Sequence, residues 1–207
     1  ILGPGTDTAA PPTVRVQPGV SLIALRRHLA NAFPAYLFTP DPTETSASIG
    51  GMVACNASGA CSFAYGPTRT HVEALTVVLA DGDTLTLRRG HDKVDGNRFS
   101  LTTDGGRLIS GELPHIHMPT VKNSAGYWVK PDMDLLDLFI GSEGTLGILA
   151  EIELRLHAKP FQTLGILCFF AAEAHALACV QAIRSAASAA LPHTLAAIEY
   201  FDAESLR

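Results

Sequence analysis

The sequence has few cysteines, no long apolar run and no cluster of basic residues, and each of these absences excludes a class of protein. Its four cysteines show no CxxC spacing, so no disulfide scaffold is expected and a reducing compartment is favoured. Apolar stretches such as residues 166–172 are far shorter than the roughly 20 residues of a membrane helix. The 15 Lys and Arg residues are scattered, whereas a nucleic-acid surface needs clustered basic side chains. We therefore expect a cytoplasmic protein, free or peripheral to a membrane, with no transmembrane segment and no nucleic-acid partner.

Signatures of several enzyme classes are also missing. No G-x-G-x-x-G follows a strand pattern and no G-x-x-x-x-G-K occurs, which argues against a Rossmann or P-loop nucleotide site. No G-x-S-x-G elbow supports a Ser/His/Asp triad. His115 and His117 would share one face of a strand, as two metal ligands do, but no further ligand stands at a convincing spacing. No metal site is predicted, and no catalytic residue is assigned.

The composition is that of a folded globular protein, with 47% apolar and 17% charged residues and a net charge of -5 over 207 residues. This length allows one domain plus part of another. Leu22, Leu25 and Leu29 recur at helical spacing, so residues 20–33 predict an amphipathic helix with Ser21 as its N-cap. A short strand over residues 13–17 precedes it.

Later segments predict a sheet and then a second unit. Asp81-Gly82 is a hairpin turn signal between two strand patterns, residues 72–79 and 84–88. Residues 90–122 are interpreted as an irregular excursion. The remaining predicted elements are a short helix over 134–139, strands over 148–156, 164–170 and 195–201, and a helix over 172–190. Because a β-α-β order follows Lys159-Pro160, a second domain is expected over residues 161–207.

These elements predict an α+β fold. A mixed or antiparallel sheet flanked by helices is expected for residues 1–160, followed by the opening β-α-β of a ferredoxin-like domain. Residues 38–66 stand out because they are rich in Pro, Gly, Ser, Thr and Asn. Segments of this length without regular structure are usually functional, and glycine lets the main chain approach a ligand closely. We interpret residues 38–66 as a binding segment for a large, flat cofactor with polar edges.

Several motifs in order carry a family resemblance. They are PTETSASIGGMVACNASG, YGPTR, HVEAL, VVLADG and LFIGSEGTLGI. This series resembles the FAD-binding proteins of the vanillyl alcohol oxidase and p-cresol methylhydroxylase (PCMH) superfamily, in the glycolate oxidase and D-lactate dehydrogenase branch. The resemblance covers roughly residues 13–160 and implies a PCMH-type FAD-binding domain, with FAD as the cofactor.

The resemblance also implies which residues contact FAD. Residues 42–48 would lie along its isoalloxazine and ribityl part, and the contacts from this region would come from Pro42, Thr43, Thr45, Ser46, Ser48, Ile49, Gly50, Gly51, Cys55, Asn56, Ala57, Ser58, Gly59, Tyr65 and Gly66. Contacts toward the adenosine end would come from Glu143, Gly144, Thr145, Leu146, Gly147 and Ile148. Taken alone, the GSEGTLG run is equally explained by a helix end followed by a tight turn. Valine at Gly50 or Gly51 would fill cofactor space and is expected to abolish FAD retention while leaving most of the fold intact.

Lys122 to Tyr127 resembles the family's K-N-x-x-G-Y stretch on the substrate side of the flavin. Lys122 would attract a carboxylate substrate, and Tyr127 would donate a hydrogen bond or pack. The alternative is a simple turn at Gly126. Val121 stands where relatives acting on D-2-hydroxyglutarate tend to have Arg, which argues against that dicarboxylate.

The leading functional hypothesis is an FAD-dependent oxidoreductase that oxidises a 2-hydroxy acid by hydride transfer to the flavin. The alternatives are a redox-neutral transferase of the alkylglycerone-phosphate synthase type and a flavin-free binding module. The electron acceptor is not identified. The resemblance also implies a pyrophosphate loop upstream and most of the substrate domain downstream. We therefore expect this chain to fold, to be colourless or to bind FAD weakly, and to have no turnover. A second copy of the chain is one expected cover for its cofactor-facing surface.

Overall fold

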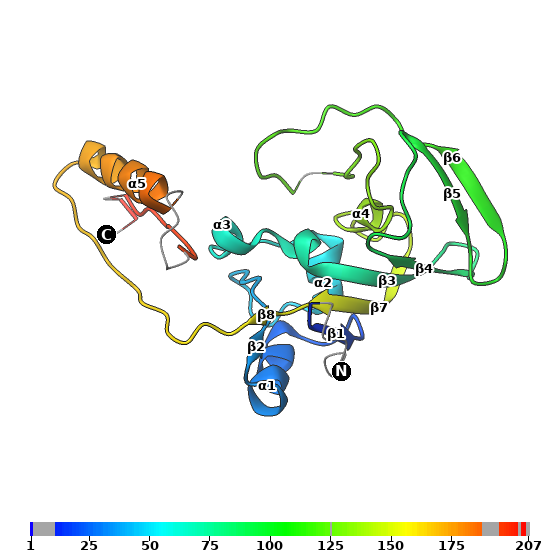
Figure 1. Ribbon diagram of the computed structural model, residues 1–207, viewed down its shortest axis with the longest axis horizontal. Helices are drawn as coiled ribbons and strands as arrows, with labels where there is room; N and C mark the ends of the chain where they lie inside the picture. Colours follow the sequence, from blue (N-terminus) through cyan, green and yellow to red (C-terminus); the bar gives the residue numbers. More distant parts are fainter. Residues whose placement is uncertain (2–10, 125, 188–194, 203, 206–207) are drawn as a thin grey trace.

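The computed structural model describes residues 1, 11–124, 126–187, 195–202 and 204–205. Its centre is a four-stranded sheet in the order β1-β7-β3-β4, and each neighbouring pair is antiparallel. The strands are β1 (Thr13–Val16), β3 (Val72–Val78), β4 (Thr84–Arg88) and β7 (Ile148–Arg155). Figure 1 shows α2 next to β3 and β7, and α1 next to β2. The predicted α+β class with an antiparallel sheet is confirmed.

The β3–β4 hairpin forms as its turn residues predict. Gly82 adopts φ +87°, a left-handed conformation that favours glycine. The turn closes through Leu79 N–H, which donates to the carbonyl oxygen of Asp83 at 2.8 Å. Because the turn is local in sequence, it sets the register from Val78↔Thr84 to Ala74↔Arg88.

Helix α1 (Leu22–Ala32) confirms the predicted amphipathic helix. The Ser21 hydroxyl accepts a hydrogen bond from Ala24 N–H at 3.3 Å, which satisfies one of the free donors at the helix start. Leu22, Leu25 and Leu29 are buried against the core.

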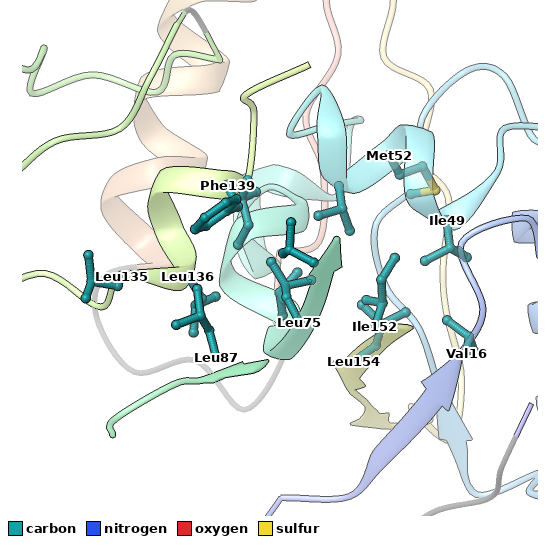
Figure 2. Packing of buried hydrophobic residues seen from close by; sticks show 14 of the residues in the cluster. Val16, Ile49, Met52, Leu75, Leu87, Leu135, Leu136, Phe139, Ile152 and Leu154 are labelled. Atoms are coloured by element: carbon teal, nitrogen blue, oxygen red, sulfur yellow. The ribbon is translucent and has the colours of Figure 1, made fainter. Parts of the chain in front are cut away.

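Residues 38–66 are more ordered than expected, because they hold α2 (Ile49–Ala54) and α3 (Ser62–Tyr65), followed by the 3-10 turn η1 (Thr68–His71). Two glycines make α2 a poor helix former by propensity. Burial compensates: Ile49, Met52 and Val53 are almost fully buried. Figure 2 shows Ile49 and Met52 of α2 in the cluster that also contains Ile152 and Leu154 of β7.

Another part of the core lies against β3 and β4. Helix α4 (Leu136–Phe139) is shorter than the predicted helix over 134–139. Leu135, Leu136 and Phe139 lie near Leu75 and Leu87 in Figure 2. A single apolar cluster therefore ties the sheet both to α2, which contains two glycines, and to α4, which precedes the glycine-rich residues 141–147.

The interpretation of residues 90–122 as irregular was wrong in part. Strands β5 (Arg98–Thr102) and β6 (Leu108–Glu112) form an antiparallel hairpin. Its turn is stabilised by Gly106 at φ +88° and by a hydrogen bond from Thr103 N–H to Arg107 O at 2.9 Å. A second small pair, β2 (Tyr36–Leu37) with β8 (His157–Ala158), was not predicted.

Two predicted strands are absent from the described part of the chain. Residues 164–170 and 195–201 have no strand structure, so the expected β-α-β opening does not form here. Side chains along the first of these segments are exposed, including Leu164, Ile166, Leu167 and Phe169. Strand propensity requires a neighbouring strand to pair with, and the described residues provide none at this place.

Helix α5 (Glu173–Ala187) confirms most of the helix predicted over 172–190, and residues 188–190 lie outside the described residues. Figure 1 shows α5 away from the sheet, at the end of an extended segment. Within the described residues, no helix combines the length and the apolar character that crossing a membrane requires.

Candidate functional site

An open pocket of about 390 Å³ lies where the two glycine-rich motifs meet. One wall comes from the turn before α1 and from α2, and the other comes from α4, the loop after it and the start of β7. The lining residues are Pro18, Gly19, Ser48, Gly50, Gly51, Ala54, Phe139, Ser142, Gly144, Gly147, Ile148 and Leu149. Six predicted cofactor residues thus share one pocket, namely Ser48, Gly50, Gly51, Gly144, Gly147 and Ile148.

Backbone hydrogen bonds join the two motifs directly. Gly141 N–H donates to Val53 O, and Glu143 N–H donates to Ala54 O, both at 3.0 Å. These bonds fix residues 141–147, which we call the glycine loop, against the end of α2. Glu143 and Gly144 adopt φ +54° and +79°, so the loop takes two consecutive left-handed residues, an arrangement that L side chains rarely support.

The four pocket glycines that the sequence predicted as cofactor contacts differ in what a side chain would meet. A Cβ at Gly50 would lie 2.5 Å from Cβ of Pro18, and one at Gly147 would lie 2.5 Å from Cγ1 of Val77. These two glycines are therefore required by the fold itself. A Cβ at Gly51 would meet only Ser48 Oγ, at 3.0 Å, and one at Gly144 would meet nothing within 4 Å. Gly51 and Gly144 leave open space above the main chain, as a cradle for a flat ligand does.

The predicted residues before α2 lie beside the pocket and mainly shape the backbone. Ser48 is the N-cap of α2, and its hydroxyl accepts from Gly51 N–H at 3.1 Å. The Glu44 carboxylate accepts from Ser46 N–H at 2.8 Å and from the Ser46 hydroxyl at 2.6 Å, and these bonds lower the pKa of Glu44. Thr45 O accepts from Ile23 N–H at the start of α1. Pro42 and Thr43 do not line the pocket, and Ile49 is buried in the core.

The predicted residues after α2 also have roles within the fold. Asn56 is buried at φ +47°, and its side-chain oxygen accepts from Arg69 N–H at 3.0 Å. A Cβ at Gly59 would lie 2.0 Å from Asp41 O, so that glycine permits a close approach of two chain segments. The Tyr65 ring packs against His157 with centroids 5.1 Å apart. Cys55, Ala57, Ser58, Tyr65 and Gly66 do not line the pocket.

Tyr127, predicted on the substrate side, is tied to the glycine loop. Its hydroxyl lies 2.7 Å from the hydroxyl of Thr145, which in turn donates to Ser142 O at 2.6 Å. Leu146 packs partly buried against the core. Lys122 is exposed. The structure therefore brings Tyr127, but not Lys122, into contact with the predicted cofactor-binding residues.

His115 and His117 are exposed and do not lie on a strand, contrary to the expected geometry. Strand β6 ends at Glu112, before these two residues. Across the described ranges, no three His, Cys, Asp or Glu side chains converge as metal ligands would.

Sequence reasoning missed two buried polar residues of η1. Arg69 is 8% exposed and bonds to the carbonyl oxygens of Asp137 and Ile140 just before the glycine loop. His71 is also buried, and its Nε2 lies 2.7 Å from the Thr39 hydroxyl. Burial lowers the pKa of His71 to about 4. The YGPTR motif contained the only available signal for Arg69, but an arginine in a polar run is normally interpreted as exposed.

Known proteins resemble this chain both in sequence and in structure. The model of the FAD binding domain family matches residues 9–88. The D-lactate dehydrogenase of Anaerostipes hadrus is 34% identical over 154 residues, covering 74% of this chain and 25% of that protein. Glycolate oxidase subunit GlcD of Bacillus subtilis is 33% identical over 159 residues, covering 76% of this chain and 26% of that protein.

A solved structure of an alkyldihydroxyacetonephosphate synthase superposes with a TM-score of 0.55 at 24% identity, covering 84% of this chain and 24% of the other. At that identity the likeness shows the fold alone. The chain spans about a quarter of the length of these relatives. Together with the motif order and the antiparallel α+β architecture, these similarities show that the chain carries an FAD-binding domain of the PCMH type, similar in sequence to part of the D-lactate dehydrogenases and glycolate oxidase subunits.

Proposed function

We propose that the pocket between α2 and the glycine loop holds part of FAD, in an enzyme that oxidises a 2-hydroxy acid. The observation that carries this proposal is that motifs far apart in the sequence form one pocket. A structural turn at residues 141–147 would not need to face the glycines of α2. The comparisons support the proposal because the related proteins are named D-lactate dehydrogenase and glycolate oxidase subunit.

The residues present fit a flat, largely apolar ligand with polar edges. Gly51 and Gly144 leave space that a Cβ would fill. Phe139, Ile148 and Leu149 supply apolar surface around that space. The hydrogen bonds to Val53 and Ala54 hold the two walls together, and walls held by their own main chain lower the ordering cost of binding a ligand.

FAD, when bound, supplies the acceptor for the hydride of the substrate. The residues of this chain would bind and orient the cofactor. The main chain at Gly51 and Gly144 would approach it, and Ser48 would hold the start of α2 in place. We assign Lys122 to attraction of the substrate carboxylate and Tyr127 to support of the glycine loop. Residues 1–160 are proposed as the FAD-binding domain, and residues 161–207 as the beginning of a substrate domain.

The test is the visible spectrum of the full-length protein, followed by anaerobic addition of D-lactate or glycolate. We expect a bound flavin whose absorbance is bleached by a 2-hydroxy acid. A bound flavin that no 2-hydroxy acid bleaches would instead favour the redox-neutral transferase class. Absence of flavin from the protein after incubation with FAD would contradict the proposal.

A further inference from the structure

We propose that Arg69 is a positioning residue that holds the glycine loop against α2 and thereby keeps the pocket open. The inference about the loop rests on contacts of this chain alone. Its consequence for FAD binding rests on the proposed function. Arg69 is suited to this role because it lies at the junction of the two motifs and is almost completely buried.

The guanidinium bonds to the segment that leads into the loop. Its Nη1 donates to the carbonyl oxygen of Asp137, and its Nη2 donates to the carbonyl oxygen of Ile140. Ile140 immediately precedes Gly141, the first residue of the loop. Helix α4 ends at Phe139, and the last carbonyls of a helix have no partner within it. Arg69 satisfies two such carbonyls at once and so fixes the direction in which the chain leaves α4.

The same residue also contacts the end of α2. The backbone N–H of Arg69 donates to Asn56 Oδ1 at 3.0 Å, and Asn56 is the residue after the C-cap Cys55. A Cβ built on Gly141 would lie 3.4 Å from Arg69 Nη2 and 3.5 Å from Asn56 Cβ. Arg69 and Asn56 therefore form the support beneath Gly141, at the point where the loop donates its first hydrogen bond to Val53 O.

Charge neutralisation does not by itself account for Arg69. The Asp137 carboxylate lies 3.3 Å from Arg69 but is also bound by Arg89, at 3.1 and 3.3 Å. Arg89 further reaches Asp134 at 3.4 Å. The acidic side chains thus keep a cationic partner without Arg69. The carbonyl oxygens of Asp137 and Ile140, in contrast, accept hydrogen bonds from the two terminal guanidinium nitrogens of Arg69.

Packing makes the geometry specific to arginine. The guanidinium carbon lies 4.9 Å from the centroid of the Trp128 ring, and a planar guanidinium can stack while both terminal nitrogens donate in its plane. An ammonium group cannot serve both carbonyls and stack in this way.

The experiment measures amide hydrogen exchange on the ligand-free chain, comparing wild type with Arg69→Lys and Arg69→Met. The Gly141 and Glu143 amides report directly on the two bonds that close the loop onto α2. We expect both amides to lose protection in Arg69→Met and to lose part of it in Arg69→Lys, while the amides of β3 and β7 keep theirs. The control is Leu29→Ala in α1, which removes buried side-chain volume away from the loop and should lower protection across the sheet and loop together.

A second measurement links the loop to the cofactor. The dissociation constant for FAD should rise at least about tenfold in Arg69→Met, with a smaller rise in Arg69→Lys, and should be unchanged in Leu29→Ala at a temperature where both proteins are folded. The positioning role would be overturned if Arg69→Lys and Leu29→Ala lowered the protection of the Gly141 and Glu143 amides by equal amounts, each measured relative to the amides of β3 and β7. Failure of wild type to bind FAD would contradict the proposed function, and the exchange comparison would still decide the role of Arg69.

If Arg69→Met and Arg69→Lys do not fold, Trp128→Leu replaces them, because it removes the stacked ring and leaves the guanidinium in place. We then expect the same two amides to lose protection to a smaller extent. Unchanged protection of Gly141 and Glu143 in Trp128→Leu, together with unfolding of both Arg69 variants, would show that Arg69 supports the whole fold and would overturn the proposal.

Discussion

The backbone N–H of Glu143 donates a hydrogen bond to the carbonyl oxygen of Ala54 at 3.0 Å. The first residue belongs to the glycine loop and the second ends α2, so this bond joins two motifs that are far apart in the sequence. Both residues stand beside the pocket glycines Gly51 and Gly144. The proposed FAD site therefore depends on the long-range pairing of α2 with the glycine loop and on no single motif.

Gly51→Val should weaken FAD binding without unfolding the chain. A side chain at this position projects into open space and meets only Ser48 Oγ, so the valine would occupy ligand volume. We expect the dissociation constant for FAD to rise at least about tenfold, equivalent to about 1.4 kcal/mol, in a flavin fluorescence titration. Ala30→Val, at an exposed position of α1, is the control for helix propensity. Equal FAD affinity of Gly51→Val and Ala30→Val would contradict the site.

Gly59→Ala should destabilise the fold by about 1 to 3 kcal/mol, the usual cost of overpacking. Its Cβ would lie 2.0 Å from Asp41 O and 2.4 Å from Asp41 C, so the backbone must move. The resemblance placed Gly59 among the cofactor contacts, whereas this geometry predicts a role in chain packing. Urea unfolding measures the change, with Gly165→Ala as the control because its Cβ meets nothing within 4 Å. A stability equal to that of the control would show that the Asp41 segment yields easily.

Gly50→Val is a poorer probe of the cofactor than the sequence suggested. Its Cβ would lie 2.5 Å from Pro18 Cβ and 3.1 Å from the Pro18 main chain, so we expect a lower unfolding midpoint as well as weaker FAD binding. The measurement is the unfolding midpoint of Gly50→Val and of Gly51→Val, followed by circular dichroism, and we expect the lower midpoint for Gly50→Val. Identical midpoints would mean that the turn at Pro18 adapts to the added side chain.

The stability of the chain should fall as the pH falls from about 6.5 to about 4. Burial lowers the pKa of His71 to about 4, below the value of about 6.5 for an unfolded histidine. The unfolded chain therefore binds more protons in this window, and the free energy of unfolding decreases with decreasing pH. Burial also lowers the pKa of His157, whose ring lies 5.1 Å from His71, so both residues act in the same direction.

His71→Gln should flatten this pH dependence by an amount on the order of 2 kcal/mol between pH about 6.5 and about 4. Glutamine cannot titrate but can still bond to the Thr39 hydroxyl. Urea unfolding at several pH values is the measurement, and His115→Gln, which changes an exposed side chain, should retain the wild-type slope. A slope in His71→Gln equal to that of wild type would assign the pH dependence to other groups.

Local signals predicted the local elements. Ser21 with its periodic leucines was sufficient for α1, and Asp81-Gly82 for the β3–β4 hairpin, because caps and turns depend on neighbouring residues. The hairpin of β5 and β6 was missed because its Gly105-Gly106 turn lies in a polar stretch that was read as irregular. Residues 164–170 show the opposite error, since strand propensity has no effect without a pairing strand.

The site was predictable only through motifs, and its geometry was not. The sequence identified Gly50, Gly51, Gly144 and Gly147 as a group, but not that two of them are needed for packing and two leave open space. Arg69 was missed because its guanidinium donates to the main-chain carbonyl oxygens of Asp137 and Ile140. Such partners leave no pattern in the sequence.

The most direct test of the account is an NMR titration of the isotopically labelled chain with FAD, which detects even weak binding. The central claim is that α2 and the glycine loop form one cofactor surface. We predict that the amide signals of Gly51 and Gly144 shift together and saturate at the same FAD concentration, while those of the β5–β6 hairpin remain in place. Shifts confined to one of the two motifs, or absent from both at saturating FAD, would contradict it.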